Sequence, residues 1–311
     1  MDHLRHLLEN LLVDYHRPYF LSSDPLEFVH RYQDPWDQEA VALCAALLAY
    51  GNVKIVRSSV AQLLKRLEEL GPSPSRVIRE LENPAQLERA RKKLKTFYHR
   101  FNQGSDLLIL LRLLGRSWRE HGSLGAHFLK GLKPDALDIG DALNELMAQW
   151  EKWIAEMKLQ PRPSFYYLMT APKDGSACKR WCMLLRWMGR NDELDPGLWA
   201  KQGKLLEGVD SSRFLKSHQL VIPLDTHTGR IAQYLGLTER KSLNFRAARE
   251  VTANLKIVDP LDPTRFDFSL SRLGILDLCQ RKYRAEICTQ CQLVSACKFA
   301  KKSAALRKAR A

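Results

Sequence analysis

Four cysteines near the C-terminus have a spacing that is typical of a metal site. Cys279, Cys288, Cys291 and Cys297 follow the pattern C-x8-C-x2-C-x5-C and make up four of the seven cysteines in the chain. Thiols this close in sequence can converge on one ion or cluster, whereas the short loops between them are too tight for unstrained disulfides. Zinc and an iron–sulfur cluster both accept four thiolates, so the spacing leaves the metal open. The alternative is four unrelated reduced thiols.

A lysine lies at the start of a segment that predicts an amphipathic helix. With Ser176 as the N-cap, the helix would turn one face to the core and the other to solvent. The core face would carry Trp181, Leu184, Leu185 and Met188, and the opposite face would carry Lys179, Met183, Arg186 and Arg190. The positive helix end and neighbouring Arg180 disfavour an ammonium at Lys179, which favours a nucleophilic amine. The alternative is an ordinary solvated helix face.

An aspartate precedes a second predicted helix. Asp225 is expected to cap this helix by accepting hydrogen bonds from the backbone amides of residues 226–228. A capping carboxylate at the mouth of a cleft can also stabilise a cationic intermediate, so the two roles are compatible. Nearby His227 is a candidate phosphate contact, with a structural role as the alternative.

The composition favours a polyanionic partner. The chain has 311 residues and a formal net charge of +14, from 49 Lys and Arg against 35 Asp and Glu. Such an excess points to nucleic acid, although it can instead serve solubility. No export signal and no long apolar run is evident, so we expect a cytoplasmic, nucleoid-associated protein with reduced cysteines and no membrane contact.

Helical periodicity covers most of the chain and predicts an all-α fold. Apolar residues recur at helical spacing in residues 2–16, 37–51, 59–71, 106–122 and 141–157. We expect one helical domain over residues 1–298, with the cysteine loop at 279–297. The basic segment 299–311 is expected to be a separable tail that is disordered or contacts phosphates.

Together these segments resemble the helix–hairpin–helix DNA glycosylase superfamily, which includes endonuclease III and the adenine and 8-oxoguanine glycosylases. The segment LDTHTGRIAQYLGL resembles the family's V-D-T-H-x-x-R-x-x-x-R-L and implies that Asp225 is catalytic. DGSACK is similar to the hairpin L-P-G-x-G-x-K, with Gly175 and Ala177 at the glycine positions and Lys179 as the nucleophile. The cysteine spacing resembles C-x6-C-x2-C-x5-C, with a longer first gap here.

The resemblance implies a bundle of two interleaved helical subdomains that binds damaged double-stranded DNA as a monomer. It implies a [4Fe–4S] cluster, with zinc as the alternative, and a bifunctional N-glycosylase and AP lyase that removes an oxidised purine such as 8-oxoguanine. The implied DNA contacts are Gly175, Ser176, Ala177, Arg180, Arg186, Arg190 and His227, with Met183 and Cys182 as candidates for packing on the flipped base. The alternatives are a non-catalytic DNA-binding protein on the same scaffold and an RNA-binding helical protein.

A long segment separates the two candidate catalytic residues. Residues 191–223 lie between Lys179 and Asp225, where most members of the superfamily have little more than one helix. Apolar residues recur in this segment, so we expect it to have some packed structure of its own. These residues are Trp199, Leu205, Leu206 and Phe214.

Overall fold

The computed structural model describes residues 2–206 and 213–308 and confirms an all-α fold. Its α-helices are α1 (Asp2–Tyr15), α2 (Pro35–Leu47), α3 (Val53–Glu68), α4 (Pro74–Glu80), α5 (Pro84–Leu94), α6 (Gly104–His121), α7 (Leu124–Gly131), α8 (Gly140–Glu156), α9 (Pro163–Tyr166), α10 (Lys179–Gly189), α11 (Thr226–Leu235), α12 (Phe245–Val258), α13 (Asp267–Ile275), α14 (Ala285–Cys288) and α15 (Lys298–Lys308). The described β-structure is one hairpin of β1 (Tyr98–His99) and β2 (Asn102–Gln103) and one isolated bridge. No helix in these described ranges is both long and apolar enough to cross a membrane.

Short polar residues set the starts of many helices. The side chain of the residue before the helix accepts a hydrogen bond from an amide of the first turn, which satisfies a donor that has no partner within the helix. Several of these helices also have proline at their first position, where its missing N–H is not needed. The capping residues are Asp34, Asn52, Ser73, Asn83, Ser123, Asp225 and Asn244.

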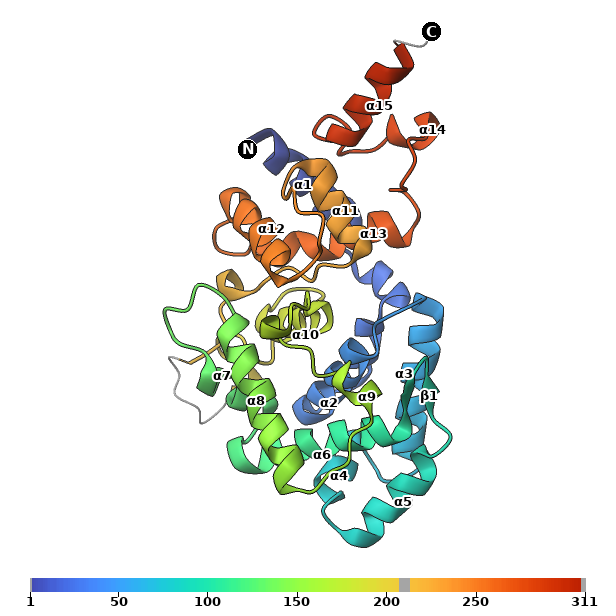
Figure 1. Ribbon diagram of the computed structural model, residues 1–311, viewed down its shortest axis with the longest axis vertical. Helices are drawn as coiled ribbons and strands as arrows, with labels where there is room; N and C mark the ends of the chain where they lie inside the picture. Colours follow the sequence, from blue (N-terminus) through green and yellow to red (C-terminus); the bar gives the residue numbers. More distant parts are fainter. Residues whose placement is uncertain (1, 207–212, 309–311) are drawn as a thin grey trace.

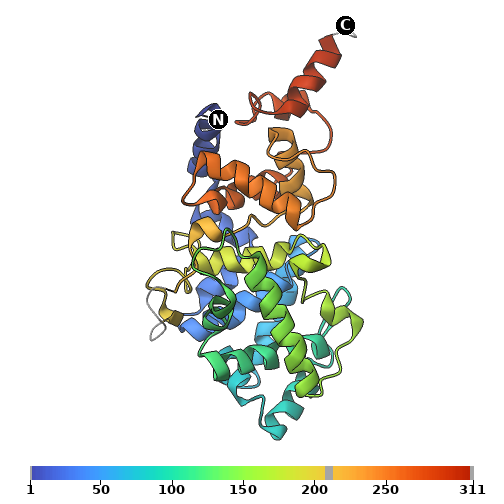
Figure 2. The same cartoon turned by 60° about the vertical axis from the view of Figure 1, so that its left-hand side comes forward.

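The first helix joins the last ones in space. Helix α1 packs against α12 and α13 through an apolar stripe of Leu4, Leu7, Leu8 and Leu11. Figure 1 shows these helices and α11 at one end of an elongated molecule and α2 to α8 at the other, with α10 between them. Both termini lie at the same end, and α15 projects from it (Figure 1 and Figure 2).

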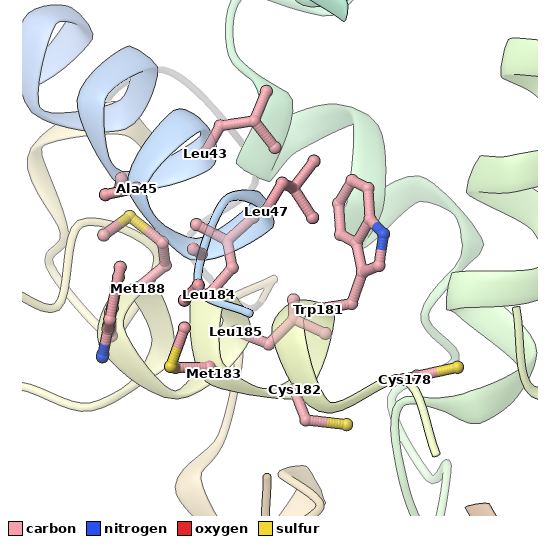
Figure 3. Packing of buried hydrophobic residues seen from close by; sticks show 14 of the residues in the cluster. Leu43, Ala45, Leu47, Cys178, Trp181, Cys182, Met183, Leu184, Leu185 and Met188 are labelled. Atoms are coloured by element: carbon pink, nitrogen blue, oxygen red, sulfur yellow. The ribbon is translucent and has the colours of Figure 1, made fainter. Parts of the chain in front are cut away.

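Helix α10 is buried along almost its whole length. Every residue from Arg180 to Gly189 is buried, and α10 packs against α2, most of whose residues are also buried. Figure 3 shows Trp181 and Leu184 facing Leu47 and its neighbours in α2, while Cys182 and Met183 lie on the other side of α10. The prediction that one face of this helix is exposed to solvent is therefore wrong, because other elements of the protein cover that face as well.

The structure describes parts of two segments that the sequence pattern sets apart. In the segment 299–311, α15 runs from Lys298 to Lys308, and Phe299 stacks on Tyr234 of α11 with ring centroids 4.5 Å apart. In the segment 191–223, Trp199 packs into the common core and stacks on Phe128, so this part of the segment has no separate core. Residues 207–212 and 309–311 lie outside the described residues.

A buried carboxylate holds three parts of the chain together. Glu39 of α2 is fully buried and accepts hydrogen bonds from the Trp118 and Trp199 indoles and from the amides of Leu124 and Gly125. Burial raises the pKa of Glu39, and the four hydrogen bonds oppose that rise. The carboxylate therefore fixes α6, α7 and the segment around Trp199 to α2.

We expect Glu39→Ala to destabilise the protein strongly. The change leaves four buried donors without an acceptor, and one such unsatisfied group already costs about 1–3 kcal/mol. Urea denaturation should show a loss of at least ~3 kcal/mol in the free energy of unfolding. Glu88→Ala on the exposed side of α5 is the matched control and should change it by less than ~0.5 kcal/mol. Equal stability of both variants would contradict this role of Glu39.

Candidate active site

A pocket of about 310 Å³ lies where α10, α11 and α13 meet the loop after α2. Its lining includes Lys179, Asp225 and His227, three of the residues singled out from the sequence. The volume lies at the lower end of the range for small-molecule sites. The pocket is therefore large enough for a compact organic group.

Lys179 is the first residue of α10. The N-cap is Cys178, which has a left-handed backbone with φ of 50°, so the prediction of Ser176 as the N-cap is wrong. The Ser176 hydroxyl instead accepts a hydrogen bond from the Cys178 amide and closes the turn before the helix. The Lys179 side chain is 28% exposed, and its amine donates to the Ala49 carbonyl at 3.2 Å. The lysine thus begins the buried helix but keeps its amine accessible from the pocket.

Asp225 uses its two carboxylate oxygens differently. Oδ1 accepts from the amides of His227 and Thr228 at 2.8 and 2.9 Å, which confirms the predicted helix cap. Oδ2 lies 4.0 Å from Nζ of Lys179. The structure therefore brings together the lysine and the aspartate that lie on either side of the segment 191–223.

A second carboxylate, not identified as a site residue from the sequence, lines the pocket. Asp267, the first residue of α13, lines the pocket and accepts a hydrogen bond from Arg186 at 2.9 Å. Burial raises its pKa to about 6; Arg186 and Lys179 lower it, and negative Asp225 raises it further. The only local signal is that Asp267 opens an apolar helical stretch, and that signal is shared by many capping aspartates.

Three arginines predicted to bind DNA are buried instead. Arg180, Arg186 and Arg190 are 6%, 2% and 4% exposed. Arg186 pairs with Asp195 and Asp267, whereas Arg190 pairs with Asp195 and with the carboxylates at positions 192 and 262. Arg180 donates to the backbone carbonyl of the last residue of α2 and to a carbonyl in the segment after α9. The prediction that these side chains contact phosphates is therefore wrong, because their donors face protein acceptors.

The residues that the motif resemblance assigns to a DNA-binding hairpin, Gly175 to Ala177, remain at or near the surface. Gly175 has φ of +75° and is exposed, and a Cβ built on it would meet no atom within 4 Å. Ser176 and Ala177 are half-buried, and in the described part of the chain neither amide donates a hydrogen bond. Amides without acceptors at a helix N-terminus are suited to binding an anion.

His227 lies where α11 and α13 touch. A Cβ on Gly274 would lie only 2.6 Å from Cβ of His227, so the glycine permits this close approach. Arg230 lies 3.4 Å from Nδ1 of His227 and also donates to the carbonyl of Cys279 at 2.7 Å. Of the two candidates for packing on a base, Met183 lines the pocket, whereas Cys182 is fully buried and does not.

The four C-terminal cysteines are free thiols of intermediate exposure. Burial raises the pKa of Cys279 and of Cys291, and neighbouring thiols of the group raise both further. Within the described ranges, however, no group of three His, Cys, Asp or Glu side chains is placed to hold a metal ion. Cys288 and Cys297 instead accept hydrogen bonds from the amides of Arg284 and Ala300. The donor set has the right chemistry for zinc or a cluster, but the positions of the thiols do not fit one.

Metal analysis tests the ligand set. From the spacing of the four cysteines, we expect anaerobically purified protein to contain iron and acid-labile sulfide in equal amounts. Cys291→Ser should lower the iron content, whereas Cys44→Ala, which removes a thiol in α2, should not. Stoichiometric zinc without iron would support the alternative metal. Protein without either metal would show that the thiols are not ligands.

Comparison with known proteins places the chain in a family but not in the glycosylase superfamily. A family model described as protein of unknown function (DUF2400) matches residues 24–276. No curated protein and no solved structure matches the chain. The superfamily membership inferred from the motifs is therefore wrong, and its short motif matches do not outweigh a match over most of the chain. The matched segment includes Lys179 and Asp225 and ends before Cys279, and the chain belongs to the DUF2400 family.

Proposed function

We propose that this protein is a DNA base-excision glycosylase with AP-lyase activity that acts on an oxidised purine in double-stranded DNA. One observation carries the proposal: the amine of Lys179 lies 4.0 Å from a carboxylate oxygen of Asp225, and both are accessible from one pocket. The proposal rests on this geometry and on the charge of the chain, not on membership of a glycosylase family.

The chemistry requires a nucleophile and a carboxylate at the sugar of a flipped nucleotide. The amine of Lys179 attacks C1′ with its lone pair while the glycosidic bond breaks, and the damaged base leaves with the bonding electrons and takes up a proton. Loss of a proton from nitrogen and opening of the sugar ring give a Schiff base, and β-elimination then cleaves the 3′ phosphate ester. Asp225 stabilises the positive sugar and accepts protons from the amine.

Contacts with the DNA backbone would come from residues 173–177, before α10, rather than from the buried arginines. Ser176 and Ala177 precede Cys178, the N-cap of α10, and Lys179 follows that cap as the first residue of the helix. Lys173 in this segment is exposed and adds a positive charge, although Asp174 beside it opposes that charge. This arrangement supports phosphate binding next to the pocket without reading of the base sequence.

The first test replaces the two candidate catalytic residues. Lys179→Gln should abolish borohydride trapping on abasic-site DNA and strand nicking, since the amine that forms the Schiff base is gone. Asp225→Asn retains Oδ1 as the helix cap but loses the charge facing Lys179, so the excision rate should fall by about 10²–10⁴-fold while the fold persists.

Lys92→Gln on α5 is the control, because it removes one positive charge away from the pocket and from the residues proposed to contact DNA. This variant should be trapped by borohydride on abasic-site DNA and should nick the strand at nearly the wild-type rate. Wild-type rates of excision in both pocket variants would mean that Lys179 and Asp225 form only a structural ion pair.

A non-catalytic DNA-binding protein is the second candidate. The observation that favours it is that the Lys179 amine already donates to the Ala49 carbonyl, which is also compatible with a purely structural lysine. Borohydride trapping of the wild-type protein separates the two candidates, because a binder without a nucleophilic amine leaves no covalent adduct. Competition between duplex DNA and structured RNA tests RNA as the partner.

Salt dependence tests the electrostatic part of the proposal. Each phosphate contact contributes about −0.9 to the slope of log affinity against log salt, so several contacts should give a slope of roughly −4 or steeper. Lys173→Gln should make the slope shallower by about 0.9, whereas Lys92→Gln on α5 should leave it unchanged. A nearly flat slope for the wild-type protein would show that its positive charge does not bind DNA.

A further inference from the structure

Three aromatic rings form a cluster at the surface beside the pocket. We call Tyr50, Phe101 and Tyr167 the aromatic platform. Tyr50 and Phe101 stack with ring centroids 5.3 Å apart and planes 28° apart, and Tyr167 meets both rings edge-on at 5.0 and 4.7 Å. Phe101 and Tyr167 are 41% and 42% exposed, so a large part of two rings faces solvent.

The platform is held in place from three directions. Tyr50 follows α2, Phe101 lies in the turn of the β1–β2 hairpin, and Tyr167 follows α9. The Tyr50 hydroxyl lies within hydrogen-bonding distance of two acceptors on the β1–β2 hairpin, the carbonyl of His99 and Oδ1 of Asn102. Asn102 in turn donates to the Ser164 carbonyl in α9. The rings are therefore ordered before any partner binds, which lowers the entropic cost of stacking.

A buried cation lies under the rings and connects them to the pocket. The Arg180 guanidinium lies 4.1 Å from the Tyr167 ring centroid and 5.1 Å from that of Tyr50. It directly follows Lys179, the candidate nucleophile. Ala49 and Gly51, on either side of Tyr50, line the pocket. The platform and the pocket therefore lie on opposite sides of the short loop that contains Ala49, Tyr50 and Gly51.

The charge around the platform is suited to a polyanion. Lys54, Arg100 and Arg162 are exposed on the three elements next to the rings. Arg100, in the hairpin turn, also packs against Gly51 at the pocket rim. A partner with planar groups to stack and phosphates to pair is a nucleic acid, because each base offers a π-face and each linkage a negative charge.

We propose that the aromatic platform stacks an unpaired DNA base next to the nucleotide that occupies the pocket. This inference rests on the proposed function for the choice of DNA, and it adds a second binding element that the excision chemistry does not require. Stacking at this position would stabilise a locally opened duplex, so that the protein prefers gapped or unpaired DNA over a fully paired duplex.

Fluorescence of 2-aminopurine tests the proposal. The probe is a DNA duplex with a short single-stranded gap that carries 2-aminopurine beside an abasic site. Binding of the wild-type protein should quench this fluorescence. Phe101→Leu and Tyr167→Leu should remove most of the quenching and weaken binding to the gapped duplex at least about fivefold, as removal of a stacked ring does elsewhere.

Tyr98→Leu is the matched control on the same hairpin. Tyr98 is exposed, but among the described residues no ring contact joins it to the platform, so binding and quenching should stay within about twofold of wild type. Phe101→Trp keeps a planar ring in the turn and should retain quenching, which separates loss of stacking from damage to the hairpin.

The outcomes distinguish this inference from the proposed function. Quenching can be measured in Lys179→Gln or in a wild-type protein that borohydride does not trap on DNA. Quenching that persists in either case supports the platform independently of the excision chemistry. Wild-type affinity and quenching in both Leu variants would overturn the platform. An equal loss in Tyr98→Leu, or tighter binding to RNA of the same sequence, would also overturn it.

Discussion

The position of Lys179 depends on charges buried at the other end of its helix. Arg186 and Arg190 lie inside the protein, where an unpaired guanidinium is strongly unfavourable, so each must be surrounded by acceptors. Asp195 accepts from both arginines, and Asp267 accepts from Arg186. Because Asp267 begins α13 and α13 packs on α11, this network sets α10 relative to the helix that Asp225 caps.

The same network explains why the pocket contains an uneven distribution of charge. Two carboxylates, Asp225 and Asp267, lie near Lys179, but Arg186 neutralises only the second of them. The raised pKa of Asp267 follows mainly from its burial, whereas Asp225 is 35% exposed. An oxygen of Asp225 thus faces the Lys179 amine, while Asp267 pairs with Arg186 and connects α10 to α13. A buried pair of this kind contributes more to a defined arrangement than to net stability.

Local features were predictable from the sequence, whereas long-range ones were not. The apolar spacing of α1, α6 and α8 is set by neighbouring residues, so these helices lie close to where the sequence predicts them. Helix α10 was misjudged because Arg186 and Arg190, four residues apart, look like an ordinary solvated stripe. Their partners Asp262 and Asp267 are more than 70 residues further along the chain. Spacing likewise identifies the four cysteines as candidate ligands, but it does not determine where their side chains point.

The end of α2 and the loop after it connect the pocket to the aromatic platform. The carbonyls of Leu47, the last residue of α2, and of Ala49 in the loop accept hydrogen bonds from Arg180 and Lys179, two consecutive residues of α10. Consecutive side chains on a helix diverge by about 100°, so this short segment can receive the amine on its pocket side and the guanidinium on its platform side. A shift of α10 along its axis would therefore move both side chains together. The hydrogen bonds that hold Arg180 under the platform and the Lys179 amine at the pocket therefore depend on the same short stretch of backbone.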